Sequence, residues 1–241
     1  MIINHKHKYL FLWNPKAAGT SIVRTLNKLD PYCANSYVRN NHIDVKGLLR
    51  KHNANREYAI KHVKKQVGEK YIKEILPETL DRYFKFMVVR NPWARLYSAW
   101  NYLKSGAGGA GGYKQWEKHV GGDTFQKFLL NIPDSIMWLL HFRPQVNWAK
   151  GKRRKKFLEV DQILRVESLE SDFYALCSVL DLPKTKIQTI NTAQAPEHFS
   201  LEGWEKPTSK KSYKHYYNAK TIDIVGELYK DDVEYFGYEF E

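Results

Sequence analysis

The chain has 241 residues, of which 43% are hydrophobic and 14% aromatic, and this is enough for one domain with a full hydrophobic core. No apolar run approaches the roughly 18–20 residues of a membrane-spanning helix, and the start of the chain lacks a secretory signal, so we expect a cytoplasmic protein without a membrane span. The formal net charge of +13 attracts anions such as nucleotides, nucleic acids or acidic glycans.

The segment from Tyr9 to Leu29 predicts a buried strand, a tight turn and a helix. An apolar run is followed by a polar turn at Asn14–Ser21, and then by apolar residues at helical spacing. The first backbone N–H groups of such a helix, together with its dipole, favour an anion in the turn.

The side chains of this turn suit a phosphate group. Lys16 supplies a positive charge, Thr20 and Ser21 supply hydroxyl donors, and Gly19 allows a ligand to approach the backbone. The spacing differs from a Walker A loop, in which the lysine follows the second glycine, because Lys16 precedes Gly19. An ordinary strand–turn–helix connection with a surface lysine is the alternative interpretation.

A second transition from strand to helix is predicted around His62. A short apolar run, Tyr58–Ile60, precedes this histidine, and apolar residues follow it at every fourth position from Val63 to Ile75. Ligands of open α/β sheets bind at the edge where strands lead into helices, so His62 is a candidate for chemistry. A partly exposed histidine at the start of a helix is the other interpretation.

A third strand and helix follow at Phe84–Ser98. The apolar run Phe84–Val89 predicts a central parallel strand, and Pro92 suits the first turn of the next helix, on which Ser98 lies. Arg90, between the strand and the helix, can hold a phosphate through two parallel hydrogen bonds.

The rest of the chain supplies scaffold elements. A further strand is predicted at Gln162–Val166. Helices are predicted at Thr124–Leu130, Glu167–Leu180 and Ala219–Phe236, and also at Ile136–Trp148, a segment that Arg143–Gln145 interrupts.

Four other features have structural interpretations. Cys33 and Cys177 lack the spacing of metal ligands, so we expect no metal site and two buried thiols, with a disulfide as the alternative. The basic run Lys150–Lys156 is expected to be a solvated face or loop. The Gly-rich run Ser105–Gly112 is either a plain flexible loop or a lid over substrate.

Taken together, these stretches resemble the binding segments of the sulfotransferase family. The sequence PKAAGTS after the first strand resembles the family's 5′-phosphosulfate loop, and the segment Phe84–Ser98 resembles its 3′-phosphate-binding segment. Ser209–Ser212 resembles a late basic loop that folds over the nucleotide. The resemblance implies a cofactor site made of Pro15, Lys16, Ala17, Ala18, Gly19, Thr20, Ser21, Arg90, Ser98, Lys210 and Lys211.

The resemblance covers most of the chain and is nearest to the carbohydrate-type branch, which includes heparan and chondroitin O-sulfotransferases and soluble bacterial relatives. It implies an α/β fold, a three-layer sandwich with a central parallel β-sheet flanked by helices, which is the P-loop NTPase-like sulfotransferase fold. We expect a single domain over residues 1–241.

The implied reaction moves a sulfuryl group from 3′-phosphoadenosine-5′-phosphosulfate (PAPS) to a hydroxyl group of a glycan or glycoconjugate, leaving 3′,5′-adenosine bisphosphate. By resemblance, His62 takes the proton of the hydroxyl group, and Lys16 stabilises the charge on the leaving 5′-phosphate. No metal ion takes part.

Two other functions stay open. A nucleotide-dependent phosphotransferase with the same cradle would need Mg²⁺ and a carboxylate beside the loop, and no carboxylate cluster is evident there. A basic nucleic-acid-binding module would use the positive charge, but the sequence has no helix-turn-helix, zinc-finger or RNP-type pattern.

Overall fold

The computed structural model describes residues 2–4, 7–29, 82–105, 124–149, 151–153, 156–158, 160–188 and 212–241. Contacts divide the chain into two compact units. The first comprises Met1–Val89 and Gln145–Ile190, and the second comprises Arg90–Pro144 and Asn191–Glu241. The single domain expected for residues 1–241 stays a prediction.

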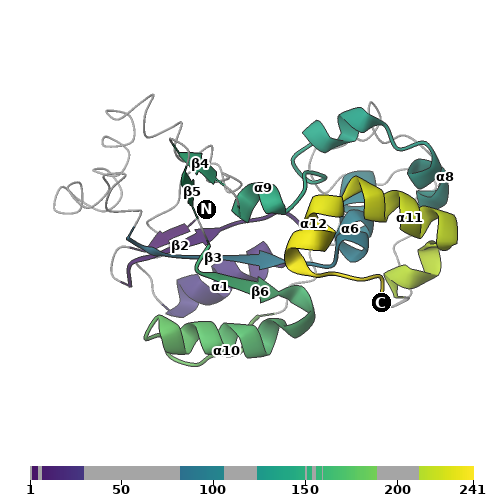
Figure 1. Cartoon of the computed structure of the whole chain (residues 1–241). Coiled ribbons are helices and arrows are strands. Elements are labelled where there is room, and N and C mark those ends of the chain that lie inside the picture. The colour runs from purple at the N-terminus through teal and green to yellow at the C-terminus, as the bar shows by residue number, and fades with distance from the viewer. Residues whose placement is uncertain are drawn as a thin grey trace. The chain divides into compact units, whose positions relative to one another are not determined.

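The first unit is built on a four-stranded sheet with the order β1-β2-β3-β6 (Figure 1). Strands β2, β3 and β6 run parallel, and β1 pairs with β2 in the antiparallel direction at the edge. This confirms the central parallel sheet of an α/β fold, whereas β1 is too short for its pattern to be predicted. The strands are β1 Ile2–Asn4, β2 Tyr9–Leu12, β3 Phe84–Val89 and β6 Gln162–Arg165.

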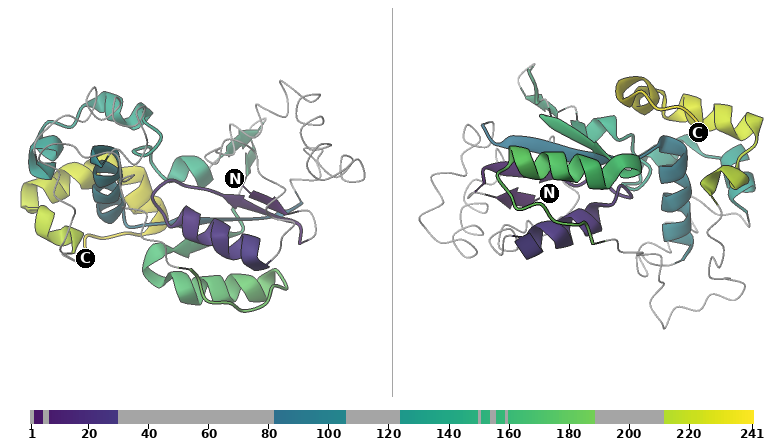
Figure 2. Two further views of the ribbon diagram at one scale, coloured as in Figure 1. Left: turned by 180° about the vertical axis from the view of Figure 1, so that it is seen from behind. Right: turned by 90° about the horizontal axis from the view of Figure 1, so that it is seen from below.

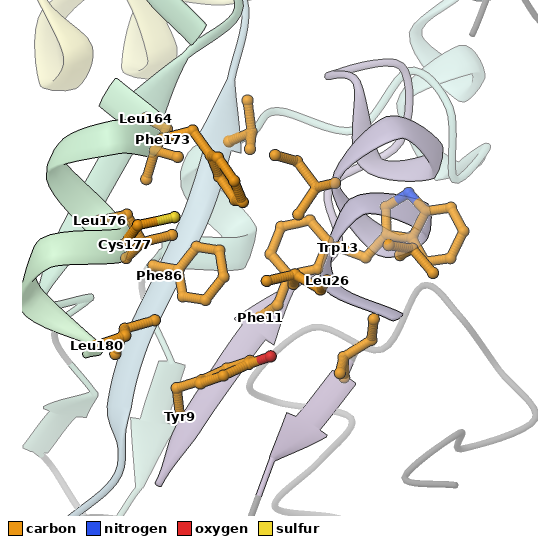
Figure 3. Close-up of a cluster of buried hydrophobic side chains, with 14 of the residues drawn as sticks. Tyr9, Phe11, Trp13, Leu26, Phe86, Leu164, Phe173, Leu176, Cys177 and Leu180 are labelled. Atoms are coloured by element: carbon orange, nitrogen blue, oxygen red, sulfur yellow. The ribbon is translucent and has the colours of Figure 1, made fainter. Parts of the chain in front are cut away.

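Helices cover both faces of this sheet. Helices α1 (Gly19–Leu29) and α10 (Leu169–Val179) lie on one face, and the short α9 (Val146–Ala149) lies over the other (Figures 1 and 2). Phe11 of β2 and Phe86 of β3 are paired in register, and their rings stack with centroids 5.1 Å apart beneath α1 and α10 (Figure 3). Burial on both faces explains why these strands are continuous apolar runs.

The hydrophobic core of the first unit joins both helices to the sheet (Figure 3). Its largest side chains are fully buried, and burying each contributes about 1.5–3 kcal/mol. Cys177, one of the two thiols expected to be buried, lies in this core, and burial raises the pKa of its thiol. Core members include Tyr9, Phe11, Ile22, Leu26, Phe86, Val88, Leu164, Phe173, Leu176 and Cys177.

A polar clamp sets the register of β3 against β6. The backbone N–H of Lys85 donates to the carboxylate of Asp161 at 2.6 Å, and the Lys85 ammonium lies 3.4 Å from the same oxygen. The ammonium also donates to the carbonyl of Tyr83 at 2.8 Å. Because the starts of the two strands are held together, their carboxyl ends reach the same edge of the sheet, as the pairing of Val89 with Arg165 shows.

The second unit is helical. Helix α6 begins at Pro92 and is capped by the side chain of Asn91, and α11 packs against both α6 and α8. The indole N–H of Trp93 in α6 donates to the carbonyl of Ile222 in α11 at 3.0 Å. The elements are α6 Pro92–Lys104, α8 Phe125–Leu130, the 3₁₀ turns η2 Asp134–Trp138 and η4 Tyr213–Tyr216, α11 Ala219–Leu228 and α12 Lys230–Phe236.

The helix predicted at Ile136–Trp148 is wrong. The segment forms η2, a series of turns and the single turn α9. The carbonyls that a continuous helix would need are taken by other elements: Tyr229 donates its hydroxyl to the carbonyl of Phe142 at 2.7 Å, and Arg95 donates to the carbonyl of Arg143 at 2.9 Å. The prediction for Ala219–Phe236 needs a smaller correction, because it forms two helices that meet at Tyr229.

Other predicted elements change only at their ends. The helix predicted at Glu167–Leu180 begins with a 3₁₀ turn, η3 Val166–Ser168, and continues as α10.

The basic run Lys150–Lys156 contributes to two short antiparallel strands, β4 Gly151–Arg153 and β5 Lys156–Leu158, instead of a plain loop. Within the described part of the chain, no helix has the length and apolar character needed to cross a membrane.

Candidate functional site

The predicted phosphate loop connects β2 to α1 at the carboxyl end of the parallel strands. Helix α1 begins at Gly19, and the backbone N–H of Ile22 donates to the carbonyl of Ala18 at 3.2 Å, so Ala18 accepts the first helical hydrogen bond. The first turn of α1 contains no acidic residue. No carboxylate in this turn therefore neutralises the positive end of the helix dipole, which favours binding of an anion.

The sign of φ alternates along the backbone of this loop, a pattern that occurs in anion-binding nests. Lys16 has φ 65° and Ala18 has φ 53°, whereas Ala17 and Gly19 are not in the positive-φ region. When such residues alternate, successive N–H groups turn toward one side and form a concavity for an anion, as in P-loops. Positive φ costs about 1–3 kcal/mol at a residue other than glycine, and such strain clusters at functional sites.

Burial alternates along the loop as well. Pro15, Ala17, Gly19 and Ser21 are buried, and this set anchors the turn to the first unit. The remaining three residues, Lys16, Ala18 and Thr20, are partly exposed. A charged side chain, a backbone N–H and a hydroxyl group are therefore the parts of the loop that a ligand meets first.

Packing requires a glycine at position 19, and the sequence alone does not reveal this requirement. A β-carbon at this position would collide with the indole ring of Trp13. Trp13 is only 9% exposed and belongs to the core of the first unit (Figure 3). The glycine thus lets the ring pack against the start of α1, and the ligand approach predicted there stays a prediction.

Arg90 and Ser98, the predicted 3′-phosphate residues, lie in the second unit. Arg90 directly follows the last residue of β3 and is partly exposed. Ser98 is a partly exposed residue about two turns into α6. Because side chains on a helix tilt toward its N-terminus, Ser98 leans toward the end of α6 that Arg90 precedes.

Asn91 fixes the start of α6 beside Arg90. Its side-chain oxygen accepts from the backbone N–H groups of Trp93 at 3.1 Å and Ala94 at 3.5 Å. Its side-chain nitrogen donates to the carbonyl of Glu239 at 2.7 Å. This cap holds the backbone that carries Arg90, and the sequence indicates only the proline that follows it.

An aromatic pair stands next to Ser98 on α6. The rings of Tyr97 and Tyr216 stack with centroids 4.4 Å apart and an interplanar angle of 19°. Burial, followed by the hydrogen bond with Tyr216, raises the pKa of Tyr97, so its hydroxyl group stays protonated at neutral pH. Tyr216 could not be assigned to the site from the sequence, because no local pattern relates it to α6.

Two buried amides lie at the base of the phosphate loop. The side-chain nitrogen of Asn14 donates to the carbonyl of Val88 at 3.2 Å and to the side-chain oxygen of Gln145 at 2.9 Å. Asn14 is 1% exposed and Gln145 is 0% exposed. The only sequence signal for this pair is a polar residue between a buried strand and the loop.

The comparisons with known proteins agree with this geometry. The model of a protein family described as the sulfotransferase family matches residues 1–239. This chain belongs to the sulfotransferase family.

One curated relative of this sulfotransferase is carbohydrate sulfotransferase 14 of Danio rerio. It is 26% identical over 255 aligned positions, which cover 99% of this chain and 62% of the relative. This chain therefore spans less than two thirds of the relative's length. No solved structure matches this sulfotransferase.

Three predicted site residues of this sulfotransferase, His62, Lys210 and Lys211, lie outside the described residues, so their roles stay predictions. Of the Gly-rich run, only Ser105 is described. In the ranges given above, no three His, Cys, Asp or Glu side chains are grouped as metal ligands.

Proposed function

We propose that this sulfotransferase moves the sulfuryl group of PAPS to a hydroxyl group of a carbohydrate or glycoconjugate, releasing 3′,5′-adenosine bisphosphate. The observation that carries the proposal is the loop between β2 and α1. Lys16 and Ala18 have positive φ there, at the N-terminus of a helix without acid in its first turn. A phosphosulfate group has the negative charge and the acceptor oxygens that a loop of this kind would bind.

The chain's residues would act by positioning and by stabilising charge. In the transfer, a bond forms between the acceptor oxygen and sulfur while the bond between sulfur and the 5′-phosphate oxygen breaks. The 5′-phosphate leaves with added negative charge, which Lys16 and the N–H groups of the loop would stabilise. The acceptor proton passes to a base, and the family resemblance assigns that role to His62.

Arg90 and Ser98 would distinguish PAPS from nucleotides that lack a 3′-phosphate. A guanidinium group offers paired donors for a phosphate, and a hydroxyl group adds another. Lys210 and Lys211 would add charge to the same phosphate, as the resemblance implies.

The acceptor class is supported by two features. The relative named above is a carbohydrate sulfotransferase. The net charge of +13 favours acceptors that already carry negative charge, such as acidic glycans.

The proposal is tested first by ligand-dependent thermal unfolding. The purified protein is heated with 3′,5′-adenosine bisphosphate, with 5′-AMP, and with ATP plus Mg²⁺. A ligand at about 100 times its Kd stabilises the folded state by roughly 2.7 kcal/mol, which is a readily measured rise in Tm. We expect this rise with the bisphosphate and a much smaller one with 5′-AMP.

The other outcomes are equally informative. A rise only with ATP and Mg²⁺ would replace sulfuryl transfer by phosphoryl transfer. No rise with any nucleotide, combined with salt-dependent binding to DNA or RNA, would favour a nucleic-acid-binding module. If the bisphosphate binds, transfer of ³⁵S from labelled PAPS to a panel of neutral and acidic glycans identifies the acceptor.

A further inference from the structure

The amide pair Asn14 and Gln145 has no part in the mechanism above, yet it lies directly at the base of the phosphate loop. Asn14 follows Trp13 and precedes Pro15, so it lies two positions before Lys16, the first residue of the loop with positive φ. It stands beside the carboxyl end of β3, because it donates to the carbonyl of Val88 at 3.2 Å.

The orientation of the Asn14 amide is fixed by its partners. The carbonyl of Val88 can only accept a hydrogen bond, so the nitrogen of Asn14 must face it. The same nitrogen donates its second hydrogen to the side-chain oxygen of Gln145 at 2.9 Å. Both donors of Asn14 are thus used, and both tie the residue to the first unit.

The remaining atom of this amide is the side-chain oxygen of Asn14. The side-chain oxygen of Asn14 is buried and accepts no hydrogen bond from any residue within the described ranges. A buried acceptor without a donor destabilises the fold, and such groups in proteins call for a functional explanation. An apolar side chain here would avoid that cost, but it could not hold Val88 and Gln145.

The loop around Asn14 is restrained on both sides. The indole of Trp13 fills the space beside Gly19, and Pro15 restricts the backbone that leads into Lys16. A displacement of Asn14 would therefore also displace the backbone of the two residues with positive φ, Lys16 and Ala18.

We propose that Gln145, acting through Asn14, is a positioning residue that holds the phosphosulfate loop in its anion-binding conformation. This inference rests on the proposed function. Gln145 lies 131 positions from Asn14 in the sequence, is 0% exposed and accepts from the Asn14 amide at 2.9 Å. Its removal therefore weakens donor binding without removing any group that meets the donor.

The test compares Gln145→Met, Asn14→Ala and the double variant in calorimetric titrations with 3′,5′-adenosine bisphosphate. Methionine keeps the volume of Gln145 and loses the acceptor. We expect Kd to rise about tenfold in each single variant, which corresponds to one buried hydrogen bond. The double variant should be no more than slightly worse than either single one, because the two residues act as one unit.

Gln145→Glu separates positioning from general packing. A carboxyl oxygen can still accept from Asn14, and burial raises the pKa of a carboxyl group above its ordinary value. We expect affinity close to wild type at acidic pH, where the group is neutral, and weaker binding as the pH rises and a negative charge appears near the loop. Gln145→Met should show no such recovery at acidic pH.

Thr25→Val is the matched control. Thr25 is 2% exposed, donates to the carbonyl of Ser21 at 2.9 Å and accepts from the backbone N–H of Gln188 at 3.2 Å. It should lower Tm as much as Gln145→Met and leave Kd within twofold of wild type.

Each result decides between the two proposals. If wild type binds the bisphosphate and Gln145→Met and Asn14→Ala bind it equally well, the positioning role is wrong and the proposed function stands. The same conclusion follows if Thr25→Val weakens binding as much as they do. If wild type does not bind the bisphosphate, both proposals fail. Gln145→Glu decides the question in the same way should Gln145→Met not fold.

Discussion

The indole ring of Trp13 occupies the space beside Gly19 in which a β-carbon would stand. Trp13 ends the apolar run that begins with β2, and Gly19 is the first residue of α1. The contact therefore closes the phosphate loop at its two ends, and it makes the glycine a requirement of packing.

Gly19→Ala should destabilise the protein and weaken bisphosphate binding together. The new methyl group must displace Trp13, and overpacking of this kind costs about 1–3 kcal/mol. Denaturant unfolding and the Kd for 3′,5′-adenosine bisphosphate are the measurements. Replacing Trp13 with leucine in the same chain should restore part of the stability by removing the clash.

Gly226→Ala is the control for this substitution. A β-carbon at Gly226 in α11 would lie 3.5 Å from the Trp93 ring, which is an ordinary contact. We expect a gain of about 0.5–1 kcal/mol there, because alanine is the better helix residue. Equal effects at the two glycines would contradict the role given to Trp13.

Lys16→Ala should reduce turnover far more than it reduces stability. Lys16 is partly exposed and has φ 65°. Its charge would act on the leaving 5′-phosphate, and loss of one such stabilising group costs about 10²–10³ in kcat. Lys28→Ala removes the same charge from the exposed last turn of α1 and should leave kcat unchanged. A Lys16→Ala rate within a few-fold of wild type would remove this lysine from the mechanism.

The sequence predicts best those elements that depend on local pattern. The strand expected at Phe84–Val89 has the bounds of β3, because burial on both faces leaves a continuous apolar run. The segment Ile136–Trp148 has aromatic residues at helical spacing but is broken by bonds from Tyr229 and Arg95, which are distant in the sequence. No local pattern contains those donors, although Pro144 within the segment is a local sign of a break.

The candidate site also combines features that the local sequence predicts with features that depend on distant contacts. The residue types of the loop, above all Lys16, indicate an anion site from the sequence alone. The alternation of φ that forms the nest, and the bond between Asn14 and Gln145, depend on tertiary structure and could not be predicted. Gly19 could be predicted to matter, but for a different reason from the one that Trp13 supplies.

Arg95→Leu should be among the most destabilising single substitutions in the second unit. Arg95 is 1% exposed and donates to the carbonyl of Arg143, and Asp232 nearby is 0% exposed. Burial lowers the pKa of the Arg95 guanidinium, and the charge of Asp232 opposes this shift. Arg95→Leu removes the positive charge that acts on the buried carboxylate of Asp232, and an uncompensated buried charge costs about 3–5 kcal/mol.

Combining Arg95→Leu with Asp232→Asn tests whether the buried charge of Asp232 causes the loss of stability in Arg95→Leu. The double variant leaves no buried charge without its partner, so urea unfolding should show it to be more stable than Arg95→Leu alone. If Asp232→Asn adds its own full cost to that of Arg95→Leu, the two side chains do not act as a pair.

The stability of the protein should decline above about pH 10, the ordinary pKa of tyrosine. Burial raises the pKa of both Tyr229 and Tyr217. The unfolded chain therefore releases these protons at a lower pH than the folded one. The folded state binds more protons in that range, so each such tyrosine lowers the free energy of unfolding by about 1.4 kcal/mol per pH unit.

Tyr229→Phe tests whether the free energy of unfolding falls at alkaline pH for this reason. It should lower stability at pH 7, since the hydrogen bond to the carbonyl of Phe142 is lost, and it should make the alkaline decline shallower. Urea unfolding from pH 7 to 11 measures both effects, with Tyr235→Phe, on the exposed side of α12, as the control. An unchanged alkaline slope in Tyr229→Phe would show that another group controls the decline.

His62→Ala should abolish turnover and leave the Kd for the bisphosphate unchanged. The resemblance makes His62 the base that accepts the proton of the acceptor hydroxyl group, and general bases contribute about 10²–10⁴ in rate. Because the base would act on the acceptor, its loss should spare the groups that we propose to hold the two phosphates of the nucleotide. His215→Ala, at an exposed position in η4, is the matched control and should keep full activity. Measured side by side, ³⁵S transfer and calorimetric titration separate the two roles. A His62→Ala variant that still transfers sulfate would move the base to another residue, whereas one that also fails to bind the bisphosphate would place His62 in the donor site.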